Sequence, residues 1–261
     1  GVIFVSGTYL SAELRDKILL KLQTECHCPI VEIAVTDTHF PHIVLENDSA
    51  TRLLTEHLIT EHNCRRICYL GCSGETYFSD QRRDYYKEAM AAHGLPVAED
   101  DISFCDYTED DVRDALARFT RNGKPDAVVC YNDRMALLFL AAALAAGYRV
   151  PEDIAITGGD DTAEGTSVGL TSVSFPVYEM GSSGVTQLIA LMQGNEIPPV
   201  TQVTAAPVFR HSCGCKSSAP ANPVFLEQQL NHRIASLEGS ILDSLNRSAA
   251  FGHVTDLDDA L

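Results

Sequence analysis

Short apolar runs and helical patterns alternate along most of the chain. Each apolar run is five to seven residues long, which is the length of a buried strand. Helical patterns separate most of the runs, and this strand-then-helix repetition predicts parallel sheets covered by helices, an α/β protein. We expect strands at residues 2–6, 29–35, 42–46, 65–71, 101–105, 126–131 and 153–158.

Three of the helical patterns carry their own start and stop signals. Thr108 to Asp111 resembles a capping box, with an acid in place of the usual Glu or Gln, ahead of an apolar stripe. Ser79 can cap a helix that runs to Gly94. A third helix should begin at Asn132 and end at Gly147, where glycine accepts a left-handed backbone.

The composition changes after Cys215. Residues 216–223 form a polar, proline-containing linker, and leucines and isoleucines then recur every three or four positions through 224–250. That seam of about three heptads is long enough for a coiled-coil-like helix. A surface helix that folds back on the core is the alternative. Residues 251–261 would start a following module.

The net charge excludes one class of partner. The chain has 36 acidic against 19 basic residues, a formal net charge of −17, and no basic cluster, so it should not bind nucleic acid directly. No apolar run approaches the roughly 20 residues of a membrane span. No basic leader precedes an apolar segment, but Gly1 is not a methionine, so the sequence reads as a fragment.

The nine cysteines lie mostly inside apolar runs, which favours reduced thiols and a cytoplasmic protein. Three groups have some ligand character: Cys26 and Cys28 with His27; Cys64, Cys68 and Cys72; and Cys213 and Cys215. Because none of them has paired C-x-x-C spacing, no metal is expected. His57 lies on an apolar helical stripe and is interpreted as a packing histidine.

Polar residues follow the predicted strands at the ends where ligands collect in parallel α/β sheets. Ser6 ends the first predicted strand, Asn132 follows the strand at 126–131, and Asp160 follows the strand at 153–158 after one glycine. Arg82 lies in the first turn after Ser79. A cation, an amide and a carboxylate offer different hydrogen-bonding roles toward neighbouring hydroxyls. Such contacts alone bind weakly, so we expect Phe175, Tyr131 or Phe78 to add stacking against a sugar or a base.

Adjacent acids such as Asp160 and Asp161 could also hold a metal or relay a proton. However, the sequence has no GxxxxGK[ST] phosphate loop. No serine or cysteine can be assigned a general base. We therefore predict a non-catalytic protein without a cofactor.

Several segments, in the right order, carry a family resemblance: IVLENDSATRLLTEHLITEHNCRRICYLG, SDQRRDYYKEAMAAHGL, DAVVCYNDRMA, GYRVPEDIAITGGDD, LTSVSFPVYEMG and FRHSCGC. Together they are similar to the effector-binding domain of LacI/GalR bacterial regulators, which has the periplasmic-binding-protein fold. The resemblance covers residues 1 to about 215. Glu46, Tyr85 and Phe175 depart from the family pattern, which often has Asp, Gly and Gln at these positions.

The resemblance implies two α/β lobes joined by three crossovers, with a small ligand, commonly a sugar or nucleobase, held between them. The amino-terminal lobe would comprise 1–64 and 175–203, and the carboxy-terminal lobe 65–174 and 204–215. Arg82, Asn132 and Asp160 match the family's ligand contacts, whereas Asp161 would support the loop and the preceding glycines would allow a tight turn. The family's first two strand-helix units should precede Gly1, so the amino-terminal lobe is incomplete.

The predicted function is a small-molecule sensor domain of a transcriptional or signalling regulator, acting as a cytoplasmic homodimer. DNA would be contacted only through a headpiece outside this sequence. The helix at 224–250 favours a variant in which the sensor is fused to a signalling output, such as a diguanylate cyclase. A transport solute-binding protein and an enzyme are the alternatives.

Overall fold

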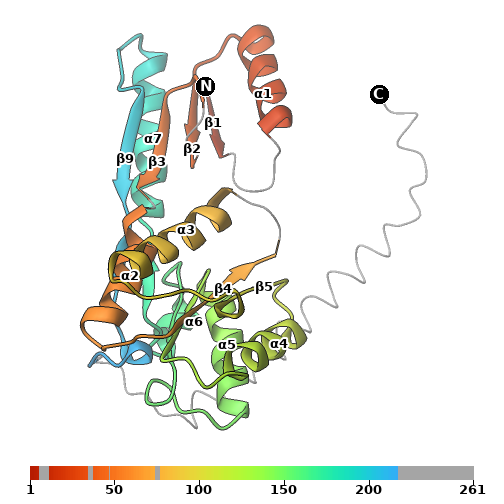
Figure 1. Cartoon of the computed structure of the whole chain (residues 1–261). Helices are drawn as coiled ribbons and strands as arrows, with labels where there is room; N and C mark the ends of the chain where they lie inside the picture. Colours follow the sequence, from red (N-terminus) through yellow and green to blue (C-terminus); the bar gives the residue numbers. More distant parts are fainter. Residues whose placement is uncertain (6–11, 35–37, 47, 74–76, 217–261) are drawn as a thin grey trace, which may run out of the picture. The chain divides into compact units, whose positions relative to one another are not determined.

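A computed structural model describes residues 1–5, 12–34, 38–46, 48–73 and 77–216 (Figure 1). Ser6 and the predicted helix at 224–250 lie outside these residues. Within this part of the chain, no helix is long and apolar enough to cross a membrane.

Two four-stranded sheets organise the described residues. The first sheet has the order β1-β2-β3-β9 and the second has the order β5-β4-β6-β7, and all neighbouring strands within each are parallel. A small antiparallel pair joins β10 to β8. The strands are β1 (Val2–Val5), β2 (Ile30–Ile33), β3 (His42–Glu46), β4 (Ile67–Cys72), β5 (Ile102–Cys105), β6 (Ala127–Cys130), β7 (Ala155–Thr157), β8 (Ser172–Ser174), β9 (Val200–Thr204) and β10 (Ala206–Val208).

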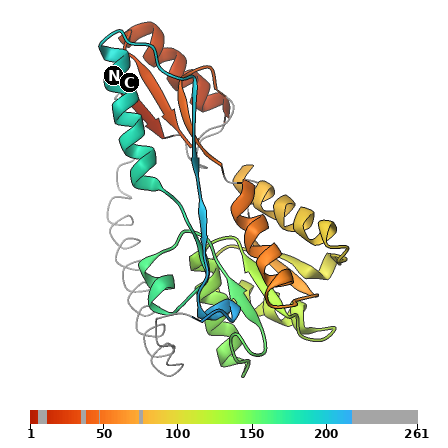
Figure 2. The ribbon, with the colours of Figure 1, turned by 90° about the vertical axis from the view of Figure 1, so that its left-hand side faces the viewer.

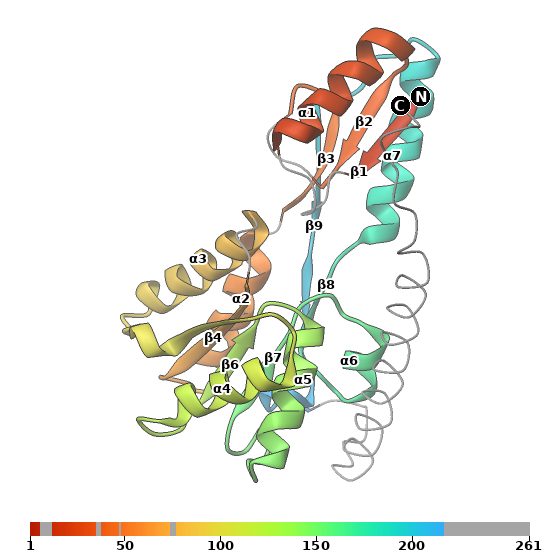
Figure 3. The same ribbon diagram turned by 90° about the vertical axis from the view of Figure 1, so that its right-hand side faces the viewer.

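Helices alternate with these strands, which confirms the predicted α/β class. They are α1 (Ala12–Lys21), α2 (Asp48–Thr60), α3 (Tyr77–Ala92), α4 (Glu109–Thr120), α5 (Asp133–Ala145), α6 (Ala163–Ser167) and α7 (Val177–Met192). Short turns of other helix types are η1 (Leu22–Cys26), η2 (Glu99–Asp101) and η3 (His211–Cys213). Figure 3 shows α1 and α7 on opposite faces of the first sheet.

Each of the seven strands predicted from apolar runs is present, with its ends shifted by at most two residues. Three strands of the second sheet, β4, β6 and β7, are almost wholly buried because helices cover both faces of the sheet, so their sequences are mostly apolar. By contrast, β8, β9 and β10 were not predicted. They are only three to five residues long, and Ala205 alone separates β9 from β10, with no intervening helix (Figure 2).

The packing of α2 corrects the predicted lobe boundary at residue 64. Leu58 and Ile59 of α2 are buried in one cluster with Ile67, Tyr69 and the rest of the second sheet's core. Figure 2 shows α2 and α3 side by side. The first sheet has its own core, in which α7 packs on β2, β3 and β9. Packing therefore changes before α2, because the apolar stripe of α2 faces the second sheet.

Helix ends agree with the capping signals in two of three cases. The Thr108 hydroxyl accepts from the Asp111 amide at the start of α4, although the Asp111 carboxylate accepts from Asp106 and not from Thr108. Asn132 caps α5, and Gly147 has a φ of 85° beyond its end. The expected cap at Ser79 is wrong, because α3 begins two residues earlier, at Tyr77.

Candidate functional site

Arg82 lies between two aromatic rings. Its guanidinium carbon is 4.6 Å from the centroid of Tyr131 and 5.2 Å from that of Phe175, and its Nη1 donates to the Tyr131 carbonyl oxygen at 2.5 Å. The three side chains come from α3, the end of β6 and the end of β8, and all are half-buried. A planar guanidinium stacks on aromatic faces in a way that an ammonium group does not. This arrangement fixes the orientation of the cation.

The loop after β7 brings Asp160 to the same place. A Cβ atom on Gly159 would lie 3.3 Å from the Tyr131 carbonyl oxygen and 3.6 Å from Nη1 of Arg82. A Cβ atom on Gly158 would lie 3.0 Å from the Cα of Asp133. Neither glycine has a positive φ. The two glycines therefore do not supply a left-handed backbone. They let the loop pack closely against the strand end and Arg82, and their role in a tight turn stays a prediction.

The two residues after these glycines, Asp160 and Asp161, are the ones with positive φ angles. Asp160 has a φ of 132° and Asp161 a φ of 52°. A value of 132° lies outside the small left-handed region that side chains tolerate, and such backbone strain typically amounts to about 1–3 kcal/mol. The Asp160 amide donates to the Val173 carbonyl oxygen, which holds the loop in this conformation. Strain of this kind concentrates at functional sites.

The electrostatics of Asp160 are also unusual. Solvent reaches its side chain, yet partial burial raises the pKa of the carboxyl group to about 6; the Arg82 guanidinium opposes that rise, and the Asp133 carboxylate adds to it. Asp160 thus titrates closer to neutrality than an ordinary aspartate. A carboxylate held in this environment accepts strongly from a ligand hydroxyl.

Asn132 has a structural role as the N-cap of α5, in addition to any contact with a ligand. Its Oδ1 accepts from the Met135 amide, and its Nδ2 donates to the Tyr107 hydroxyl at 3.1 Å. A side-chain amide has two N–H donors, so among the described residues one N–H of Asn132 is left for a ligand. Tyr107 was not singled out from the sequence, and its position opposite Asn132 depends on the loop after β5.

Asp133 and Asp161 hold the loop in place. The buried Asp133 carboxylate accepts from the amide and hydroxyl of Thr162 and from the Ser172 hydroxyl. The Asp161 carboxylate pairs with Arg210 at 2.6 Å. Asp161 therefore supports the loop, as the sequence led us to expect. The structure gathers Arg82, Tyr131, Asn132, Asp160 and Phe175 around Gly159 and the end of β6, whereas Ser6 lies outside the described residues.

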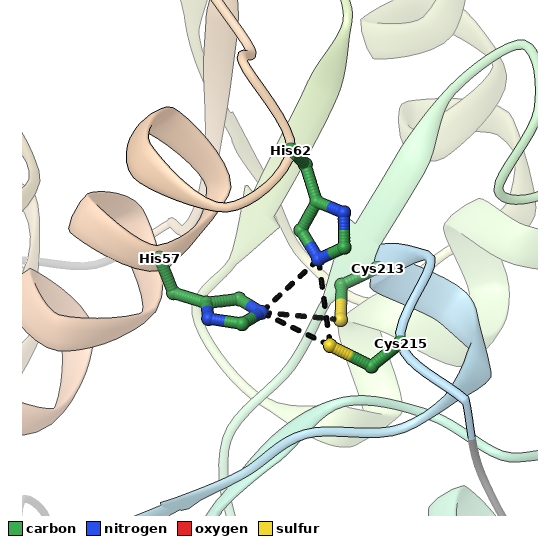
Figure 4. Close-up of side chains that lie close together, drawn as sticks. All are labelled: His57, His62, Cys213 and Cys215. Atoms are coloured by element: carbon green, nitrogen blue, oxygen red, sulfur yellow. Dashed lines mark hydrogen bonds between the residues drawn. The ribbon is translucent and has the colours of Figure 1, made fainter.

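A second cluster consists of two histidines and two cysteines that are distant in the sequence. His57, His62, Cys213 and Cys215 turn their donor atoms toward one another (Figure 4). The sequence predicted no metal, because cysteine spacing alone was weighed and His57 was assigned to packing. The signal that was missed is a pair of histidines five residues apart at the end of α2. In the folded chain they meet a Cys-x-Cys pair more than 150 positions further along the sequence.

Comparison with known proteins defines the class. A family model described as the periplasmic binding protein-like domain matches residues 55–213, more than half of the chain. The chain therefore belongs to the periplasmic binding protein-like family, within which it is an effector-binding domain of the LacI/GalR type.

Relatives of known class agree with this assignment. The regulator CelR of Thermobifida fusca is 31% identical over 76% of this chain, and the arabinose metabolism transcriptional repressor of Geobacillus stearothermophilus is 29% identical over 69%. A regulatory protein of the LacI family from Chloroflexus aggregans has a similar solved structure, with a TM-score of 0.71 and 27% identity. That match covers 80% of this chain and 75% of the other.

A complex of CelR with cellobiose is also similar, with a TM-score of 0.66 and 29% identity. The match covers 81% of this chain and 65% of that one. The chain spans 60% of the length of the CelR sequence and 52% of that of the arabinose repressor.

Proposed function

We propose that this domain is the sensor of a transcriptional or signalling regulator, and that it binds a small polyhydroxylated ligand, a sugar first of all, without catalysis. The carrying observation is the fixed guanidinium of Arg82, held between Tyr131 and Phe175, with the carboxylate of Asp160 in its electrostatic field. Donor, acceptor and apolar ring face then lie together, as the recognition of a sugar ring requires.

The relatives support a sugar over other small molecules. CelR has been solved with cellobiose, and a second relative is named for arabinose metabolism. Tyr131 or Phe175 would lie against the C–H face of the sugar, while Arg82 and Asp160 would bind adjacent hydroxyls. Nucleobases, which stack equally well on aromatic rings, are the second ligand class to test.

We propose that the sensor works in the cytoplasm, because buried cysteines in the described part of the chain, such as Cys64, Cys68 and Cys105, are free thiols, which suits a reducing compartment. We also propose a homodimer. One side of α7 packs on the first sheet through Met180 and Gly184, and the opposite side exposes Tyr178, Val185, Ile189 and Met192.

These four residues lie on one helical face, because their spacings of seven, four and three return to the same side. Tyr178 is 87% exposed and Met192 is 62% exposed. An apolar stripe of this length indicates an interaction surface. A second copy of the chain, which presents the same stripe, is the partner that we propose for it.

The experiment is a thermal-shift screen of mono- and disaccharides, cellobiose included, with nucleobases as a second panel. A ligand at 100 times its Kd stabilises the folded state by about 2.7 kcal/mol, which is a shift of several degrees for a domain of this size. A sugar that raises Tm in this way supports the proposal. If no member of either panel raises Tm, the sensor function proposed here is wrong.

A further inference from the structure

Four side chains with metal-binding atoms meet where the described chain ends. His57 lies in the last turn of α2, and His62 follows two residues after its end. Cys213 ends η3, and Cys215 follows two residues later. One donor atom from each of the four lies within 4.8 Å of all the others (Figure 4). The four residues come from only two short stretches of chain.

The spacing of the donor atoms fits a tetrahedron around one ion. Zinc bonds of about 2.0–2.1 Å to nitrogen and about 2.3 Å to sulfur place tetrahedral donors roughly 3.3 Å apart for two nitrogens and roughly 3.6 Å apart for nitrogen and sulfur. The two Nε2 atoms of His57 and His62 are 3.1 Å apart. Sγ of Cys215 lies 3.2 Å from Nε2 of His57 and 3.4 Å from Nε2 of His62, and Sγ of Cys213 lies 3.8 Å from Nε2 of His57.

The surrounding residues hold the imidazole rings in place. The Phe209 ring stacks on His57, with centroids 3.8 Å apart and planes 19° apart. Gly214, between the two cysteines, has a φ of 102°, and a Cβ atom there would lie 3.1 Å from two ring atoms of His62. A larger residue would therefore collide with the second imidazole. The glycine allows the Cys-x-Cys turn to close over the ring.

The chemistry of the donor set selects the ion. Two thiolates and two neutral imidazoles are the ligands of structural zinc, and thiolate ligands disfavour magnesium and calcium. Binding would release the two thiol protons to solvent, so that the Zn²⁺ charge is balanced by two thiolates and the half-buried site carries no net charge. Hydrogen bonds among the four side chains are a weaker explanation for their close approach, because a thiol is a weak hydrogen-bond donor. Here four atoms that carry lone pairs lie close together.

We propose that His57, His62, Cys213 and Cys215 bind one zinc ion as a structural site that ties the end of η3 to the end of α2. Four protein ligands leave no open position for water, which distinguishes a structural from a catalytic zinc site. The ion would fix the last residues before position 217 to the core of the second sheet. It would do so whether or not a sugar is bound.

The test is zinc content and coordination in the whole chain, purified with a reductant, without chelators and without a histidine tag. Elemental analysis should give one zinc per chain. Cobalt(II) reconstitution under anaerobic conditions should give the intense visible bands of a tetrahedral site together with thiolate-to-cobalt charge transfer. His62→Ala and Cys215→Ser should each reduce zinc to well below one equivalent, whereas the matched controls His211→Ala and Cys28→Ser should retain one.

Folding is checked independently, so that loss of metal cannot be confused with loss of structure. Removal of zinc by a chelator should lower the Tm of the wild type and of both controls by several degrees, and should leave the Tm of Cys215→Ser unchanged. Wild-type protein with less than a tenth of an equivalent of zinc and no cobalt spectrum would overturn the proposal. Full zinc in Cys215→Ser would overturn it equally.

Discussion

Nη1 of Arg82 donates to the Tyr131 carbonyl oxygen at 2.5 Å, while the guanidinium carbon lies 4.6 Å from the centroid of the Tyr131 ring. One residue at the end of β6 thus holds the cation through both its backbone and its side chain. The position of Arg82 is set before any ligand arrives. Preorganisation of this kind reduces the entropy lost on binding.

Arg82→Lys should weaken binding of the sugar ligand by tenfold or more, about 1.4 kcal/mol. Lysine keeps the charge but has neither the planar stacking surface nor the fork of donors. Isothermal titration calorimetry measures the effect. Asp84→Asn, on the exposed side of the same helix, is the matched control and should bind like the wild type. Equal affinities for Arg82→Lys and the control would remove Arg82 from the site.

Asp160→Asn should separate stability from binding. The pKa of Asp160 rises from 3.8 to about 6 because partial burial penalises its charged form, so the folded state holds a proton that the unfolded state has lost between these values. The contribution of Asp160 to the free energy of unfolding therefore falls as pH rises from about 4 to 6, and stays lost at pH 7. The asparagine variant should melt higher than the wild type at pH 7 and bind the sugar at least tenfold more weakly.

The same pKa predicts a pH dependence of binding. A ligand hydroxyl donates to the ionised carboxylate, so affinity should be constant above about pH 7 and fall as pH drops through 6, by up to tenfold per unit below it. Titrations at pH 5, 6, 7 and 8 measure this profile. The asparagine variant should lose the dependence in this range. A wild-type affinity that does not change between pH 5 and 8 would show that Asp160 does not bind the ligand as a carboxylate.

Asp133→Ala should destabilise the fold strongly. The carboxylate is fully buried, and its loss leaves the Thr162 amide and the hydroxyls of Thr162 and Ser172 without their acceptor. Each unsatisfied buried group costs about 1–3 kcal/mol, so a loss of about 3 kcal/mol or more is expected in urea unfolding. The surface variant Asp84→Asn should change the free energy of unfolding by no more than about 0.5 kcal/mol. A loss below 1 kcal/mol for Asp133→Ala would contradict its role in the loop.

Charges on the exposed stripe of α7 should separate the proposed dimer. Tyr178→Glu combined with Ile189→Glu places two carboxylates on each copy of the surface, and burying unpaired charges is unfavourable. Light scattering coupled to size-exclusion chromatography should then report the mass of one chain, where the wild type reports two. The exposed control Lys87→Glu should stay dimeric. A dimeric double variant would place the interface elsewhere.

Seven of the eight strands of the two sheets could be predicted from the sequence, because burial leaves a continuous apolar run, as in β4 and β6. The exception is β9, which has one buried residue and no such run. The start of α5 at Asn132 and the glycine beyond its end were equally local signals. The side to which α2 packs could not be predicted, because an apolar stripe does not say which sheet it faces. Only the structure shows that Leu58 shares a core with Tyr69.

The candidate site also has features that the sequence predicts and features that only the structure shows. Strand ends and residue chemistry were enough to select Arg82, Asn132, Asp160, Phe175 and Tyr131. Neither the strained φ of Asp160 nor the close approach that requires Gly158 and Gly159 has a local signal. The histidine and cysteine cluster was missed for a related reason, since its two halves meet only through the packing of α2 against the end of η3.

The most direct test of the central claim is a crystal structure of this domain with the sugar that gives the largest thermal shift. We predict density for the sugar ring against Tyr131 or Phe175, with its hydroxyl oxygens within about 3.2 Å of the Arg82 guanidinium and the Asp160 carboxylate. A sugar bound at full occupancy elsewhere on the domain, with Arg82 and Asp160 untouched, would contradict the account.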